Sequence, residues 1–299
     1  MSEGVGSGPA ASAASSPSKA AKIWRRTRVG AGLVVALALA FWVTDRIGAI
    51  WPVFAIGCAL SAGAVYEIGR MGRLKGRGWT LVAGGALAAT AAVWLFRDEL
   101  IAGRLGSDPF LSTGFACYAT AGVVAFALAL ASRVAQPWEP AAIALWIVPP
   151  LPLMAEIDGY FGLGGLGALI LLSKIGDIAG YYAGNAIGRH HPFKTLSPGK
   201  TTEGCVASFI AGALAGPLCV ALGLLPETTE VVPALLAGAI VNLASQAGDL
   251  LESWVKRRAE VKDSSTWFGP SGGMLDVCDS LLVSVPVALA TWPHLLPTP

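Results

Sequence analysis

The sequence predicts an all-α, polytopic integral membrane protein, and three observations carry that prediction. Of its 299 residues, 54% are hydrophobic and only 13% are charged, whereas soluble domains carry about 25% charged residues. The apolar residues are gathered into repeated runs, each close to the roughly 20 residues with which a helix crosses a bilayer. Most basic residues lie in alternate connections between these runs, as expected for a membrane topology.

Nine apolar runs are candidate membrane spans. In chain order they are residues 30–46, 50–66, 79–96, 110–131, 140–155, 163–187, 203–224, 231–249 and 274–296. The fifth run is short and rich in proline. The 37 glycines and the many alanines favour close packing of helices within lipid.

The distribution of basic residues predicts an N-in, C-out orientation. With the N-terminus in the cytoplasm, the inside segments hold 17 of the 21 Lys and Arg residues. The outside loops hold only Arg46, Arg97 and Arg104. By the positive-inside rule, the polar loops 188–202 and 250–273 therefore face the cytoplasm, where nucleotides are found.

Three regions follow from this pattern. We expect a disordered, basic tail over residues 1–28, an N-terminal transmembrane region over 29–160, and a C-terminal catalytic transmembrane region over 161–299. A secretory signal cleaved after Ala38-Leu39-Ala40 is an alternative interpretation of the first run. A retained first span is favoured because the topology accommodates it.

The segment 248–280 carries the clearest chemical pattern. Asp249, Ser253 and Lys256 are spaced i, i+4 and i+7, which places them on one helix face. A carboxylate, a hydroxyl and an ammonium in one line suit a metal ion and phosphate oxygens. Asp276 and Asp279 lie one turn apart at the start of the last run. Magnesium is usually held by one or two carboxylates together with substrate phosphates, so carboxylates from these two helices are candidate ligands.

Gly272 and Gly273 precede the last run and would let backbone N–H groups reach a phosphate at a helix start. A simpler interpretation treats the basic residues 256–258 as topology determinants and the GPSGG stretch as a turn. That interpretation leaves the acidic residues at membrane depth unexplained.

A second polar cluster, residues 196–204, lies just before the seventh run. Gly199 allows close approach of the backbone to a ligand, and Lys200 supplies a point charge for phosphate. Ser197 or Thr201, with Glu203, could equally cap the following helix. The cluster is not a Walker A loop, because the first glycine of that motif is absent.

Lys174 and Asp177 lie inside the sixth run at i, i+3, where they can pair with one another. Ionisable residues within a span mark functional sites by default. The two residues are therefore either a structural ion pair or part of a pocket wall. They also leave a membrane transporter open as an alternative function.

Several of these residues together resemble the signature of phosphatidate cytidylyltransferases (CDP-diacylglycerol synthases). That signature runs S-x-apolar-K-R, four residues, K-D, then a short loop to H-G-G-apolar-x-D-R-apolar-D. The matching residues are Ser253, Lys256, Arg257, Lys262, Asp263, Gly272, Gly273, Asp276 and Asp279. Two further stretches match through Ser197, Pro198, Lys200, Thr201, Glu203 and Gly204, and through Asp177, Tyr181 and Gly184. The resemblance covers roughly residues 170–285.

Three positions depart from the family pattern: Ser271 replaces the usual His, Val277 the usual Arg, and Cys278 an apolar residue or Thr. The missing Arg removes a possible partner for phosphate or carboxylate. A catalytically impaired paralogue that binds lipid or nucleotide is therefore an alternative to an active enzyme.

The resemblance implies an enzyme that converts CTP and phosphatidate into CDP-diacylglycerol and pyrophosphate, with another lipid phosphate as an alternative acceptor. It implies a dinuclear centre of Mg²⁺ and a second ion at Asp249 and Asp276, with Ser253 assisting and Asp279 as a further ligand. Lys200 and Lys256 would hold phosphate oxygens. Ser197, Thr201, Lys174, Asp177, Gly272 and Gly273 complete the expected substrate site. A homodimer is the family expectation, and no nucleic-acid partner is expected. The short chain without organelle-targeting features favours a bacterial plasma membrane, and the topology places the active site on its cytoplasmic side.

Overall fold

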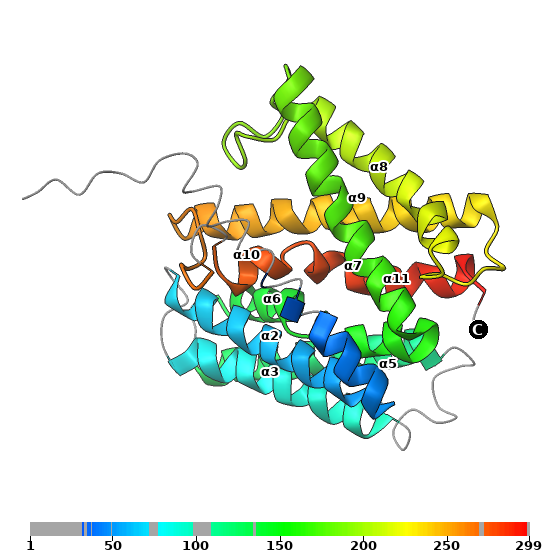
Figure 1. Cartoon of the computed structure of the whole chain (residues 1–299). Coiled ribbons are helices and arrows are strands. Elements are labelled where there is room, and N and C mark those ends of the chain that lie inside the picture. Colours follow the sequence, from blue (N-terminus) through cyan, green and yellow to red (C-terminus); the bar gives the residue numbers. More distant parts are fainter. Residues whose placement is uncertain are drawn as a thin grey trace, which may run out of the picture.

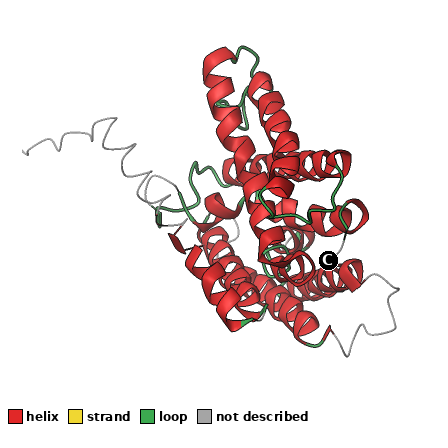
Figure 2. Ribbon diagram, turned by 45° about the vertical axis from the view of Figure 1, so that its right-hand side comes forward, coloured by secondary structure: helices red, strands yellow, loops and turns green. Residues whose placement is uncertain are grey.

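The computed structural model describes Gly32, Val35, Ala36 and residues 38–48, 50–71, 77–97, 109–133, 136–268 and 272–297. All regular secondary structure in these ranges is helical (Figure 2). Seven of the described helices are long and apolar enough to cross a membrane. The prediction of an all-α, polytopic membrane protein is thus confirmed. The tail 1–28 lies outside the described residues, and the first expected span is described only in part.

The helices are arranged in two groups (Figure 1). In chain order they are α2 (Trp51–Arg70), α3 (Arg77–Leu95), α5 (Pro109–Ala131), α6 (Trp138–Ile147), α7 (Met154–Ile187), α8 (Thr202–Ala221), α9 (Val231–Arg258), α10 (Met274–Cys278) and α11 (Leu281–Leu295). Helices α3 and α5 pack together in the first group, and α8 packs between α7 and α9 in the second.

The fifth expected span, residues 140–155, is not one helix, so that prediction is wrong. Helix α6 ends at Ile147, and turns occupy 148–153 before α7 begins. Pro149 and Pro152 fall in this interruption, and a proline has no backbone N–H for a helical hydrogen bond. The hydroxyl of Ser61 in α2 donates to the carbonyl of Val148 at 3.0 Å, which satisfies one backbone group that the interruption exposes.

Helix α7 is kinked at Gly162, whose φ of 65° and ψ of −178° are non-helical. Glycine adopts this positive φ without a steric penalty. The kink separates a short first segment from the long segment that continues to Ile187 and carries Lys174 and Asp177.

Small residues hold α7, α8, α9 and α11 together. A Cβ at Gly216 in α8 would collide with the carbonyl of Ala234 in α9, so the two backbones are in direct contact. The hydroxyl of Ser245 donates to the carbonyl of Ser173 at 2.6 Å, and Ser173 and Ser284 share a hydrogen bond of 3.0 Å. These contacts fix α9 relative to α7 and α11, and thereby fix the side chains of the site.

Candidate functional site

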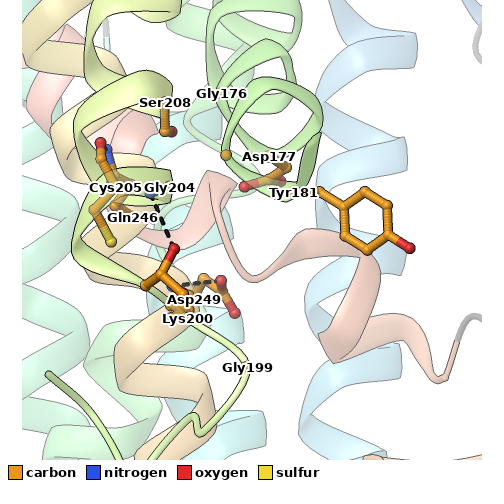
Figure 3. A pocket seen from close by; sticks show the side chains of 12 residues that line it. Gly176, Asp177, Tyr181, Gly199, Lys200, Gly204, Cys205, Ser208, Gln246 and Asp249 are labelled. Atoms are coloured by element: carbon orange, nitrogen blue, oxygen red, sulfur yellow. Dashed lines mark hydrogen bonds and ion pairs between the residues drawn. The ribbon is translucent and has the colours of Figure 1, made fainter. Parts of the chain in front are cut away.

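A cavity of about 230 Å³ lies between α7, α8 and α9 (Figure 3). Asp177 of α7, Lys200 and Thr201 before α8, and Gln246 and Asp249 of α9 contribute to its lining. The two polar segments that stand out in the sequence, 196–204 and 248–280, therefore both contribute to the lining of one cavity.

Lys200 and Asp249 form an ion pair in the lining of this cavity. The Lys200 Nζ lies 2.6 Å from the Asp249 Oδ2, and the two side chains are 21% and 30% exposed. Both groups are thus reachable from the cavity and hold opposite charges at its wall. Such a pair can exchange partners: the carboxylate can bind a cation instead, and the ammonium can bind an anion.

Capping contacts hold the loop that carries Lys200. Thr201 is the N-cap of α8, and its hydroxyl accepts from the Gly204 N–H at 3.1 Å, which confirms the capping interpretation for this residue. Glu203 accepts from the Arg189 N–H at 3.1 Å and lies 2.6 Å from the His190 ring nitrogen. Ser197 does not line the cavity; its carbonyl accepts from the Lys200 N–H at 3.1 Å.

Three carboxylates gather beside the cavity. One oxygen each from Asp249, Glu252 and Asp279 lies within 4.8 Å of the others. Glu252 is only 1% exposed, and its Oε1 has no hydrogen-bond partner among the described residues. Three acidic groups this close repel one another strongly when they are shielded from water. A divalent cation with oxygen preference would remove the repulsion and satisfy the unpartnered oxygen, so these residues fit Mg²⁺.

Glu252 is a site residue that the motif comparison missed. It lies in the GDLLES stretch, between the predicted ligand Asp249 and Ser253. The available signal was an acidic residue near the end of an apolar run, where a buried charge requires a partner.

Asp276 lies outside this carboxylate trio. Its Oδ1 lies 2.7 Å from the Lys256 Nζ, which also lies 2.6 Å from Glu252 Oε2. Its Oδ2 accepts from the Ser264 N–H at 2.9 Å and from the Gly273 N–H at 2.8 Å. Asp276 thus ties the loop before α10 to the start of that helix. It also accepts the hydrogen bond of the Gly273 N–H, the group expected to face phosphate. Its role as a metal ligand stays a prediction.

Lys174 pairs with Asp279 instead of with Asp177. Its Nζ lies 3.3 Å from Asp279 Oδ1. The expected Lys174–Asp177 ion pair is not formed, because Lys174 reaches the start of α11 while Asp177 lines the cavity. Asp177 is therefore the pocket-wall residue of the two.

The remaining candidate residues are separated from the cavity. Ser253 is 8% exposed and does not line it. Val277, at the position where the family pattern has Arg, packs against the hydrophobic core. Ser271 lies outside the described residues. Of Asp249, Ser253 and Lys256, only Asp249 lines the cavity, and their binding of one shared ligand stays a prediction.

The fold and the site together define an integral membrane protein of α-helices with a cluster of paired lysine and carboxylate side chains beside a cavity. The site combines an exchangeable lysine–carboxylate pair with a carboxylate trio suited to a divalent cation. A family model described as "Cytidylyltransferase family" matches residues 24–293. The chain belongs to this family.

Curated relatives match over a shorter stretch. A phosphatidate cytidylyltransferase of Chlamydia muridarum is 39% identical over 127 residues, which are 41% of each chain. One of Aquifex aeolicus is 38% identical over 113 residues, 38% of this chain and 41% of the relative. The Escherichia coli protein YnbB, described as uncharacterized, is 37% identical over 123 residues, 40% of this chain and 39% of the relative. The match thus spans about two fifths of each relative's length.

Proposed function

We propose that this protein transfers CMP from CTP to phosphatidate, releasing pyrophosphate and forming CDP-diacylglycerol in the membrane. The observation that carries the proposal is the Lys200–Asp249 pair facing a cavity beside the carboxylate trio. Membership of the cytidylyltransferase family and the names of two of the relatives described above support the choice of nucleotide and lipid.

The reaction is an in-line displacement at phosphorus. A phosphate oxygen of phosphatidate attacks the α-phosphorus of CTP, the bond to the β-phosphate oxygen breaks, and pyrophosphate leaves. The nucleophile is already ionised near neutral pH, so the protein's task is to position two anions and offset their repulsion. Lys200 is placed to hold a phosphate oxygen at the cavity wall, and Asp177 bounds the same cavity.

Asp249, Glu252 and Asp279 are the residues that would hold Mg²⁺, and Asp276 remains a predicted ligand. When bound, Mg²⁺ would neutralise developing charge on the phosphate oxygens. Lys256 bridges Glu252 and Asp276 and so keeps two of the acidic groups in place. Lys174 does the same for Asp279 from α7.

The location follows from the topology prediction. We place the cavity on the cytoplasmic side of a bacterial plasma membrane, with CTP arriving from the cytoplasm and the lipid's acyl chains approaching between the helices. A homodimer is part of the proposal only as a family expectation.

Purified protein incubated with radiolabelled CTP, phosphatidate and Mg²⁺ tests this function. We expect labelled CDP-diacylglycerol, no product without Mg²⁺, and no product from the Asp249→Asn variant. Product formed only with a non-glycerolipid phosphate would reject the proposed acceptor. Nucleotide binding without turnover would indicate an impaired paralogue, and solute flux in liposomes without turnover would indicate a transporter.

A further inference from the structure

A buried glutamate in α2 contacts the segment between α9 and α11. Glu67 is 1% exposed and lies one turn before the end of α2. It falls outside residues 170–285, over which the chain resembles the cytidylyltransferase signature, and it does not line the cavity. Its contacts nevertheless all go to the segment that carries Asp276.

The Glu67 carboxylate accepts four hydrogen bonds. Its Oε1 accepts from the Ser265 hydroxyl at 2.6 Å and the Met274 N–H at 2.7 Å. Its Oε2 accepts from the Ser264 hydroxyl at 2.7 Å and the Leu275 N–H at 2.9 Å. Within the described ranges, no lysine or arginine pairs with it. An ionised carboxylate has acceptor sites for all four donors, and such bonds are what allow a buried charge without a cation.

Ser264 couples Glu67 to Asp276. Its hydroxyl donates to Glu67 Oε2 and lies close to Asp276 Oδ2, while its N–H donates to Asp276 at 2.9 Å. Gly273 lies so close to both groups that a Cβ there would collide with the Glu67 carboxylate and the Ser264 hydroxyl. The carboxylates of Glu67 and Asp276 thus both accept hydrogen bonds from residues 264–275.

The neighbouring residue in α2 holds the segment at a second point. The Tyr66 ring stacks on Trp267, with centroids 5.5 Å apart and an interplanar angle of 22°. Adjacent residues of one helical turn therefore contact the loop through hydrogen bonds on one side and an aromatic stack on the other.

We propose that Glu67 is a positioning residue for the site: it fixes the start of α10 so that Asp276 holds Lys256 and Asp279 joins the carboxylate trio. Glu67 touches neither the cavity nor a reacting group, and it acts through Ser264 and the α10 backbone. The catalytic consequence rests on the proposed function. The structural consequence, an ordered start of α10, does not.

Glu67→Gln tests the proposal with almost no change of shape. Glutamine offers only one acceptor oxygen. Its NH₂ group would face a backbone N–H of Met274 or Leu275, and two donors cannot form a hydrogen bond with each other. We expect kcat for CTP to fall by about tenfold to hundredfold, the range for small displacements of catalytic groups. KM for CTP should change little, because Lys200, the expected phosphate-binding group, pairs with Asp249 of α9 and not with this segment. Amide hydrogen exchange at Met274 and Leu275 should accelerate, while exchange in α3 stays at the wild-type rate.

Two further variants sharpen the test. Glu139→Gln removes an acidic group that pairs with Arg258 on the surface and should leave activity and exchange unchanged. The effects of Glu67→Gln and Ser265→Ala on exchange should be less than additive in the double variant, because both remove the same contact.

Wild-type kcat and wild-type exchange in Glu67→Gln would overturn the proposal. So would faster exchange throughout the helices with a lower melting temperature, since that result assigns Glu67 to general packing. If the wild-type protein itself shows no turnover of CTP with phosphatidate, the proposed function fails, and the exchange experiment alone decides the role of Glu67.

Discussion

Two groups of acidic side chains lie at the same end of the helices, and they differ in how completely their oxygens are partnered. Glu67 and Asp276 accept hydrogen bonds from hydroxyls and backbone N–H groups on every side. Asp249, Glu252 and Asp279 lie close together instead, and one oxygen of Glu252 has no partner in the part of the chain that the structure describes.

This difference suggests a structural role for the fully partnered carboxylates and a ligand-binding role for the trio. A saturated carboxylate has no oxygen left for a cation, and removing it releases the donors that it orders. Each carboxylate of the trio also pairs with a lysine. The trio nevertheless keeps three close charges and, among the described residues, one unpartnered oxygen, so removing one charge relieves repulsion while it destroys the proposed metal site. Family motifs alone place Asp249 and Asp276 in one metal centre, whereas the hydrogen bonds place them in different groups.

Asp249→Asn should have the largest effect on activity. We expect turnover of CTP to fall at least about 100-fold, comparable to loss of a principal electrostatic group in an active site. The melting temperature without metal should change little, because the substitution relieves repulsion within the trio and also weakens the pair with Lys200. Radiolabel incorporation and heat unfolding in detergent measure the two effects.

Glu227→Gln, an exposed acidic residue in the turn between α8 and α9, is the matched control and should behave as wild type. Wild-type turnover in Asp249→Asn would remove the trio from the mechanism.

Asp276→Asn should have a different signature in stability. The variant weakens the 2.7 Å pair with Lys256 and the hydrogen bonds from Ser264 and Gly273. We expect a loss of about 1–3 kcal/mol in stability, seen as a lower melting temperature in the absence of metal. An unchanged melting temperature together with lost Mg²⁺ dependence would instead move Asp276 into the metal centre.

Removal of Mg²⁺ provides the third comparison. Mg²⁺ should raise the melting temperature of the wild-type protein, because a ligand that binds only the folded state stabilises it. Glu252→Gln should raise the Mg²⁺ concentration for half-maximal turnover by about tenfold and reduce the Mg²⁺-dependent gain in melting temperature. Glu227→Gln, as a control, should keep the gain. The same Mg²⁺ response in wild type and Glu252→Gln would contradict a ligand role for Glu252.

Much of this arrangement could be predicted from local sequence patterns. The apolar runs predict most of the helices because length and hydropathy are local properties. The motif residues indicate Lys200 and Asp249 because phosphate sites reuse lysine and carboxylate at fixed spacings. The exact residue at which α6 ends could not be predicted. Pro149 and Pro152 are visible in the sequence, but the hydrogen bond from Ser61 to Val148 that accompanies the interruption comes from a distant helix.

The partners of the charged side chains could not be predicted from these local patterns. Lys174 can pair with Asp177 by helix geometry, yet it pairs with Asp279, which is 105 residues away. Glu67 and Ser264 are 197 residues apart. Such contacts depend on how the helices pack, and no local spacing encodes them. An acidic residue in an apolar run signals that a partner exists, but it does not say which one.

Glu139→Gln should have the smallest effect. It tests whether the number of hydrogen bonds that a carboxylate accepts, rather than its charge alone, determines how much activity and stability its removal costs. Glu139 pairs with Arg258 at 3.2 Å, with the arginine side chain 43% and the glutamate side chain 20% exposed. Exposed pairs contribute about 0.2–1 kcal/mol, and this partly exposed pair should lie near the upper end of that range because water still reaches both charges. Stability should therefore fall by less than about 1 kcal/mol, and turnover of CTP should match wild type. A loss of activity as large as that of Glu67→Gln would mean that any acidic residue at this end of the helices matters, and that hydrogen-bond saturation does not separate the groups.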